Sequence, residues 1–104
     1  MYNNISNEEF KEGMYAKNSV LLDVRTKEEF ESGFIKGAKL IDIMSPAFAD
    51  SIQKLDKSKT YYVYCRSGGR SGSACGAMAN WGFGELHNLA NGILGWDGET
   101  ETNS

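Results

Sequence analysis

Residues 60–80 read TYYVYCRSGGRSGSACGAMAN and divide into three parts of different composition. The first five residues are β-branched or aromatic, which favours a strand. A glycine-rich loop comes next, and the small residues from Ser71 onward predict a helix. Gly72 and Gly76 allow this helix to lie close against a sheet, at some cost in helix propensity. This stretch therefore predicts one strand, one loop and one helix of an α/β protein.

The segments on either side continue the alternation of strands and helices. Ser6 with Glu9 and Thr26 with Glu29 each form the S/T-x-x-E capping box that starts a helix. The apolar run at residues 19–24 is typical of a buried parallel strand. This alternation predicts the α/β class, with a parallel sheet flanked by helices on both faces. The expected helices span residues 7–15, 27–31, 46–55 and 71–80, and the expected strands span residues 19–24, 38–43, 60–64 and 85–88.

Length and composition indicate one globular domain. The chain has 104 residues, of which 40% are hydrophobic and 24% charged, and these fractions are ordinary for a folded protein. Eleven Lys and Arg against fourteen Asp and Glu give a net charge of −3, which argues against a nucleic-acid or anionic-membrane partner. We expect a single domain over residues 1–96 and a polar, fraying C-terminal tail over residues 97–104.

The lack of targeting signals and the small number of cysteines indicate the compartment of the protein and whether it can bind a metal. No apolar run approaches the length of a membrane span, and the first residues lack the basic and apolar regions of a secretory signal. We therefore expect a cytoplasmic protein. Cys65 and Cys75 are too few for a disulfide framework, and with His87 as the single histidine they cannot form a zinc site. We expect no metal.

The loop CRSGGRS, residues 65–71, carries the clearest chemical signal. Ligands of a parallel sheet bind beyond the carboxyl ends of its strands, where this loop is expected. Its glycines allow several backbone N–H groups to point at one centre, and the following helix adds its positive end. Arg66 and Arg70 flank the same centre. The loop is therefore expected to bind an anion.

Cys65 stands at the base of this loop. Such surroundings stabilise a thiolate, which is a strong nucleophile even without a neighbouring base. The alternative is that Cys65 is a buried structural thiol in a generic anion-binding loop.

Three blocks of sequence in this order resemble the single-domain rhodanese-like sulfurtransferases. LLDVRTKEEFESGFIKGA from Leu21 resembles the DVR segment, the helix and the turn of that family. CRSGGRS resembles its active loop, and GFGELHNLANGILGW from Gly82 is similar to its last strand and the glycine turn before a tryptophan. The resemblance covers residues 5–96.

The resemblance implies a five-stranded parallel sheet wrapped by helices. It also implies that Cys65 takes a sulfane sulfur from a donor such as thiosulfate, becomes a persulfide, and passes the sulfur to a thiol or cyanide acceptor. No metal or organic cofactor is expected. Which of the two loop arginines faces the pocket stays open. The residues expected to bind the substrate are Arg66, Ser67, Gly68, Gly69, Arg70 and Ser71.

Two other functions are weighed against this one. The domain could act as a sulfur-carrier or interaction module that exchanges sulfur with a protein partner. A small cysteine phosphatase is less favoured, because such enzymes have a C-x5-R loop, whereas four residues separate Cys65 from Arg70. Phe34 and Lys36 depart from the histidine and proline usual in the family, and Asn91 from a common glycine. None of these departures changes the prediction of sulfur transfer.

Three further side chains are expected to have structural roles. Arg25 is expected to pair with Glu28 or Glu29 and to fix the turn after its strand. Cys75 is expected to pack in the core, and His87 to be solvated or hydrogen-bonded.

Overall fold

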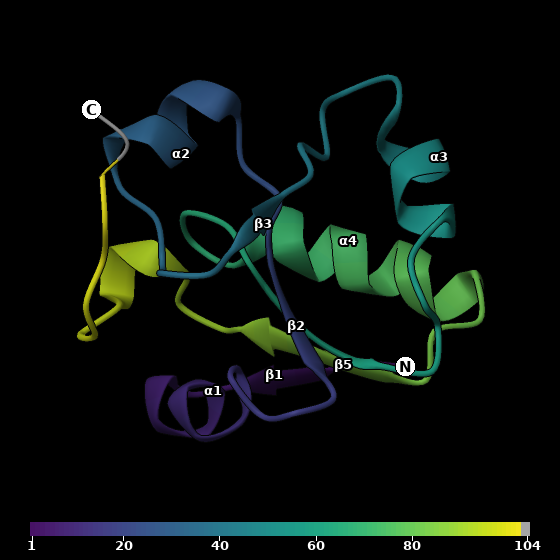
Figure 1. Cartoon of the computed structure of the whole chain (residues 1–104), viewed down its shortest axis with the longest axis horizontal. Coiled ribbons are helices and arrows are strands. Elements are labelled where there is room, and N and C mark those ends of the chain that lie inside the picture. The colour runs from purple at the N-terminus through teal and green to yellow at the C-terminus, as the bar shows by residue number, and fades with distance from the viewer. Residues whose placement is uncertain (103–104) are drawn as a thin grey trace.

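The structure is a computed structural model that describes residues 1–102, and it places a parallel sheet between layers of helices (Figure 1). The elements in chain order are β1 (Asn3–Ile5), α1 (Asn7–Gly13), β2 (Ser19–Asp23), α2 (Lys27–Ser32), β3 (Lys39–Leu40), α3 (Phe48–Gln53), β4 (Thr60–Tyr64), α4 (Gly69–Asn80), β5 (Glu85–Leu89) and the 3-10 helix η1 (Ile93–Gly95).

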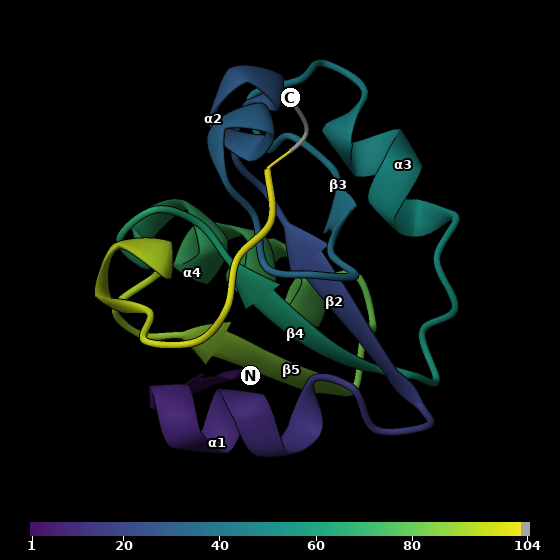
Figure 2. The ribbon, with the colours of Figure 1, turned by 60° about the vertical axis from the view of Figure 1, so that its left-hand side comes forward.

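The five strands form one sheet in the order β1-β5-β4-β2-β3, and every neighbouring pair is parallel. The central strand β4 lies between β2 and β5, with Val63 opposite both Leu22 and Asn88. Figure 2 shows the arrowheads of β2, β4 and β5 pointing toward the side that carries α2 and η1. The predicted α/β class and the five-stranded parallel sheet are confirmed, and all carboxyl ends lie at one edge.

The core has two parts, one on each face of the sheet. Because successive side chains of a strand point to opposite faces, Tyr61 and Val63 of β4 pack on the face covered by α3 and α4. Tyr64 of the same strand packs on the other face, together with Phe10 of α1 and Met14, which directly follows α1. The sheet is therefore covered on both faces, as the apolar run of β2 predicted.

Both predicted capping boxes are present. The Ser6 side chain accepts from the Glu9 amide, and the Thr26 side chain accepts from the Glu29 amide, with the glutamate reaching back in each case. Each pair satisfies donors that a helix start would otherwise leave without partners. Local sequence therefore suffices to place the starts of α1 and α2.

Two strands differ from the predicted pattern. β1 was not predicted, because it is three residues long and two of them are asparagine. Its pairing with β5, in which Ile5 lies opposite Leu89, is a tertiary contact that periodicity does not show. The predicted strand at residues 38–43 is shortened to Lys39–Leu40.

Two helix starts were also predicted wrongly. The expected helix at Pro46 begins instead at Phe48, because the Ser45 side chain accepts from the Ala47 amide and caps a turn rather than the helix. α4 begins at Gly69, two residues before Ser71, because Gly68 supplies the turn into the helix. The loop after β4 is correspondingly shorter than predicted.

The first part of the expected tail contacts the rest of the domain. Asp97 forms an ion pair with Lys11 at 2.7 Å, and the backbones of Glu101 and Phe34 exchange two hydrogen bonds of 2.8 Å. These bonds satisfy backbone groups of Phe34 at the edge of the fold. The last two residues of the expected tail, Asn103 and Ser104, lie outside the described residues. Within residues 1–102, no helix combines the length and apolar character needed to cross a bilayer.

Candidate active site

The Cys65 sulfur lies at the carboxyl end of β4, surrounded by hydrogen-bond donors. The residue is buried, with 1% of its surface exposed. The backbone amide of Gly68 donates to Sγ at 3.1 Å, and the Ser71 hydroxyl donates to it at 3.3 Å. Donors aimed at a buried sulfur favour its charged form.

Burial and hydrogen bonding act on the Cys65 thiol in opposite directions. Burial alone would raise its pKa, but hydrogen bonds from the Ser71 hydroxyl and from the amides of Ser71, Ser67 and Gly68 outweigh burial. The net result is a pKa below the ordinary value of a cysteine. A larger share of thiolate at neutral pH follows, which makes Cys65 the more nucleophilic of the two cysteines.

Gly68 gives the loop its curvature. Its φ of 99° lies in the left-handed region, where glycine is favoured. A Cβ at this position would collide with the backbone carbonyl oxygen of Ala90. The carbonyl oxygen of Gly68 accepts from the Asn88 side-chain amide at 3.1 Å, which ties the loop to β5. This conformation turns the Gly68 N–H toward the sulfur.

The segment after β5 holds the start of the loop from the other side. The amides of Ile93 and Leu94 donate to the carbonyl oxygens of Cys65 and Arg66, both at 2.9 Å. Gly92, with φ of 63°, passes so close to the Arg66 backbone that a Cβ would overlap it. The loop is thus braced by β5 and η1 before any ligand binds.

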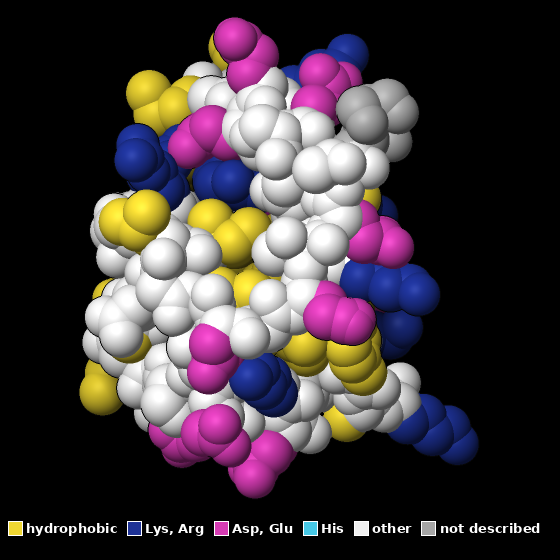
Figure 3. Space-filling model, turned by 90° about the vertical axis from the view of Figure 1, so that its left-hand side faces the viewer, with side chains coloured by type: hydrophobic (Ala, Val, Ile, Leu, Met, Phe, Trp, Pro, Cys, Tyr) yellow, Lys and Arg dark blue, Asp and Glu magenta, His cyan; other side chains and the backbone are white. Residues whose placement is uncertain are grey.

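A cleft of about 440 Å³ opens beside this loop. Figure 3 views the face that carries α2 and η1, where basic and acidic side chains lie next to a recess with hydrophobic side chains. The cleft combines charged side chains with an apolar wall, which suits a small polar ligand with a hydrophobic part. The residues that line the cleft are Arg25, Glu29, Ser32, Gly33, Arg66, Ile93 and Leu94.

Arg25 pairs with Asp23, and not with Glu28 or Glu29 as expected. Its Nη2 lies 2.6 Å from Asp23 Oδ2, its Nε lies 3.0 Å from both carboxylate oxygens, and both residues are buried. Nη2 also donates to the carbonyl oxygen of Gly33 at 2.6 Å. Arg25 pairs with Asp23 because the two residues are close together at the end of β2. The Arg25 amide also donates to Asp23 Oδ1. Arg25 is therefore fixed in the wall of the cleft.

The two loop arginines differ in their partners. The Arg70 guanidinium donates to both oxygens of Glu29, each at 2.8 Å. Arg66 is exposed and lines the cleft. In residues 1–102 the arginine ion pairs involve Arg25 and Arg70, and not Arg66. Arg66 is thus the loop arginine that faces the cleft.

The pattern of the Rhodanese-like domain family matches residues 6–99. The chain belongs to the rhodanese-like domain family. A sulfurtransferase of Allochromatium vinosum is 32% identical to it over 92% of this chain and 89% of that protein. The putative sulfurtransferase YtwF of Bacillus subtilis is 36% identical over 93% of this chain and 92% of that protein.

Solved structures agree with this assignment. The crystal structure of a rhodanese-like domain protein from Staphylococcus aureus has a TM-score of 0.83 at 30% identity, covering 98% of this chain and 99% of that one. Together with the names of the relatives, family membership supports sulfur transfer as the general activity of this rhodanese-like domain.

The predicted loop residues do not all contact the sulfur. Ser67, Gly68 and Ser71 direct donors at it, and Gly69 starts α4. The Arg66 side chain lines the cleft, and the Arg70 side chain pairs with Glu29. Other residues that shape the site were not assigned to it from sequence. Glu29 was recognised as part of a capping box and as a possible partner of Arg25, and no local pattern marks Asn88. Their roles depend on contacts between segments far apart in the chain.

The other cysteine and the histidine lie away from this centre. Cys75 is fully buried on α4, and burial, with a smaller contribution from the Cys65 charge, raises its pKa to about 12. It packs in the core as expected. His87 lies 3.4 Å from Glu85 and packs against the Tyr62 ring. Neither residue faces the cleft of the rhodanese-like domain.

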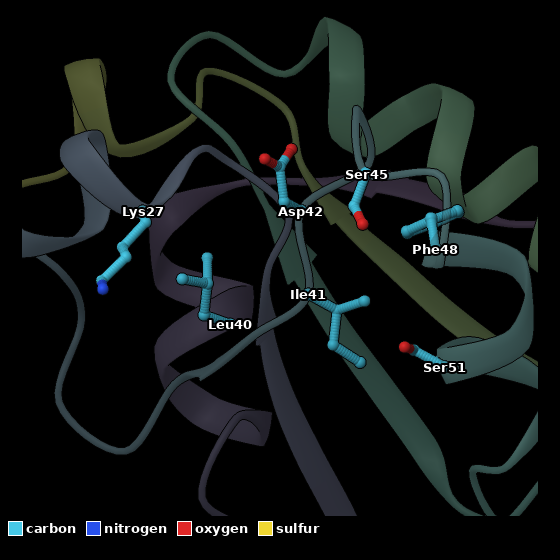
Figure 4. A pocket seen from close by; sticks show the side chains of 7 residues that line it. All are labelled: Lys27, Leu40, Ile41, Asp42, Ser45, Phe48 and Ser51. Carbon is cyan, nitrogen blue, oxygen red and sulfur yellow. The ribbon is translucent and has the colours of Figure 1, made fainter.

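A second hollow, of about 260 Å³, lies between the start of α2, β3 and α3 (Figure 4). Leu40, Ile41 and Phe48 give it an apolar surface, and Lys27 and Asp42 stand at its side. The described residues that line it include no arginine. The cleft lined by Arg25 and Arg66, which directly follows Cys65 in the chain, is therefore the candidate active site.

Replacing Ser71 with alanine tests the origin of the lowered pKa of Cys65. The substitution removes the hydroxyl donor to Sγ, so the pKa of Cys65 should rise and its alkylation by iodoacetamide at pH 6 should slow by roughly three- to tenfold. Ser73→Ala, on the exposed side of the same helix, serves as the control. Equal rates in the two variants would mean that the hydroxyl does not stabilise the thiolate.

Proposed function

We propose that this rhodanese-like domain is a sulfurtransferase that carries sulfane sulfur as a persulfide on Cys65. The observation that carries the proposal is the set of hydrogen-bond donors around Sγ, next in the chain to Arg66, which lines the cleft. Such donors stabilise an anionic sulfur without rearranging during the reaction. The positive end of α4 adds to the same effect.

The first half-reaction loads the cysteine. The Cys65 thiolate attacks the outer sulfur of thiosulfate and forms a new S–S bond. The bond between the two thiosulfate sulfurs breaks, and sulfite leaves with its electron pair. One thiolate and one dianion thus give one persulfide anion and one dianion, so that no oxidant, reductant or proton is consumed.

The second half-reaction transfers the sulfur from the Cys65 persulfide to an acceptor. A thiolate or cyanide attacks the outer sulfur of the persulfide and forms an organic persulfide or thiocyanate. The S–S bond to Cys65 breaks, and the electron pair returns to the Cys65 thiolate. The cycle uses neither a metal nor an organic cofactor, and it predicts ping-pong kinetics.

The assignment of the loop residues follows from their positions. The amides of Ser67, Gly68 and Ser71, with the Ser71 hydroxyl, would hold the persulfide anion as they hold the thiolate. Arg66 would attract the anionic donor to the cleft. Gly69 and Arg70 are the first two residues of α4.

Intact mass after incubation with thiosulfate tests the proposal. We expect a gain of one sulfur atom that a reductant removes and that Cys65→Ser lacks. No adduct from thiosulfate or from an organic persulfide would contradict it. Aryl phosphate serves as the control substrate, and we expect no hydrolysis because the loop is one residue shorter than C-x5-R.

One observation favours exchange of sulfur with a protein. Leu94 lines the cleft together with Arg66, and 68% of its surface is exposed. A protein donor or acceptor could cover it. In that case the KM for thiosulfate would be high, and Leu94→Asp would weaken transfer to the protein without changing transfer to cyanide.

A further inference from the structure

The cleft beside Cys65 contains one acidic side chain among its basic ones. Arg25 is neutralised by buried Asp23, and Arg70 is neutralised by Glu29. Glu29 itself lines the cleft, together with Arg66. Among the described residues, a donor that enters therefore meets the free guanidinium of Arg66 beside the ion pair of Glu29 and Arg70.

The Glu29 carboxylate is held firmly on Arg70. Its two oxygens lie 2.8 Å from Nη1 and Nη2, so the pair is bidentate. Oε1 also accepts from the amide and the hydroxyl of Thr26, both at 3.1 Å. The hydrogen bonds from Arg70, and to a smaller extent those from Thr26, lower the pKa of Glu29 to about 2 despite its partial burial. The carboxylate is thus charged at every pH at which a thiolate can act.

We propose that Glu29 is a specificity-determining residue: by holding Arg70, it leaves Arg66 as the free cation and makes the cleft favour singly charged sulfur donors over the thiosulfate dianion. This inference rests on the proposed sulfur transfer through Cys65. The favoured donors are organic persulfides, in which the transferred sulfur is joined to the sulfur of a thiol.

Glu29 and a donor anion compete for the Arg70 guanidinium. A guanidinium binds a carboxylate or a sulfonate-like group through the same pair of N–H donors, so Glu29 and a donor anion cannot both use them. A dianion gains more than a monoanion from a second free arginine. By neutralising Arg70, Glu29 therefore removes an attraction that would favour thiosulfate over a singly charged donor.

The chemical step is the same for both donor classes. The Cys65 thiolate bonds to the outer sulfur of the donor, and the donor S–S bond breaks. The electron pair leaves with sulfite or with the thiolate of the organic persulfide, so both reactions balance. Selectivity then lies in binding, and Glu29 should act on KM more than on kcat.

Glu29→Gln is a sharp test because glutamine keeps the capping box of α2. The amide oxygen can still accept from Thr26, while the negative charge that holds Arg70 is removed. Glu28→Gln is the matched control: Glu28 is exposed in the first turn of the same helix, and the change in net charge is identical. A difference in KM or in alkylation rate between the two variants therefore results from the lost pairing with Arg70 and not from the change in net charge.

The first readout compares thiosulfate with the persulfide of 2-mercaptoethanol, whose thiol is uncharged. In Glu29→Gln we expect the KM for thiosulfate to fall by roughly three- to tenfold, with a smaller change for the persulfide and little change in kcat. Glu28→Gln should keep the wild-type ratio of the two KM values. An unchanged ratio in Glu29→Gln would overturn the proposal.

The second readout does not need sulfur transfer. Iodoacetate is an anion and iodoacetamide is neutral, so the ratio of their rates with Cys65 measures the preference of the cleft for negative charge. We expect this ratio to rise roughly threefold or more in Glu29→Gln and to stay near the wild-type value in Glu28→Gln. A raised ratio of the iodoacetate to iodoacetamide rates, without any sulfur transfer, would contradict the proposed function and leave this inference standing. Sulfur transfer with an unchanged ratio would contradict this inference and leave the proposed function standing.

Discussion

Cys65→Ser should abolish sulfur transfer, lowering kcat by at least about a thousandfold, because a serine hydroxyl does not form the thiolate that attacks the donor. The side chain is buried, and serine differs from cysteine in one atom, so the fold should be retained. Steady-state transfer from thiosulfate or an organic persulfide to cyanide measures the loss. Circular dichroism of the variant checks that the fold is intact.

Cys75→Ala provides the matched comparison for the other thiol. Cys75 is fully buried on α4, and its raised pKa keeps it protonated at neutral pH. We expect this variant to retain sulfur transfer and to take up one sulfur atom, although loss of the buried sulfur lowers stability by about 1 kcal/mol. Substantial transfer by Cys65→Ser, or its loss in folded Cys75→Ala, would refute the assignment of the nucleophile.

Gly68→Ala should destabilise the protein by about 2–3 kcal/mol and displace the loop. The left-handed φ is unfavourable for alanine, and its Cβ would collide with the backbone carbonyl of Ala90, which cannot move away as a flexible side chain could. Any relaxation also turns the Gly68 N–H away from Cys65 Sγ. Thermal unfolding should show a midpoint lower by roughly 10 °C, and alkylation of Cys65 at pH 6 should slow.

Gly69→Ala is the control at the next position. A Cβ there would meet no atom within 4 Å, and the residue is the first of α4. Alanine should therefore change stability by less than about 1 kcal/mol, in the stabilising direction, because it restricts the unfolded chain. Similar unfolding midpoints for the two variants would show that the curvature at Gly68 is not required.

The sequence allowed the prediction of those features that short-range chemistry controls. The capping boxes at Ser6 and Thr26 place α1 and α2 because each is a set of hydrogen bonds within four residues. The strand–loop–helix unit around Cys65 is equally local, since residue type determines the strand and glycine permits the turn. The resemblance to the rhodanese-like family added the fifth strand, which the residues of β1 do not indicate by themselves.

The partners of the charged side chains could not be predicted in this way. Arg25 was expected to pair with Glu28 or Glu29, yet it pairs with Asp23 inside the sheet edge, and Glu29 pairs with Arg70, 41 residues further along the chain. Several acceptors were within reach of each arginine in sequence. The choice among them depends on which strand ends meet.

The sequence by itself thus determined the α/β class and predicted the nucleophile and the anion-binding loop, because each depends on residue types at close spacing. Only the tertiary structure decided which arginine faces the cleft. Parallel pairing of β2 with β4 brings α2 beside the loop, so that Glu29 occupies Arg70 and leaves Arg66 free. The net charge of the site includes side chains from segments far apart in the chain. The loop alone suggests two free arginines, whereas the folded protein, over residues 1–102, leaves Arg66 alone unpaired in the loop.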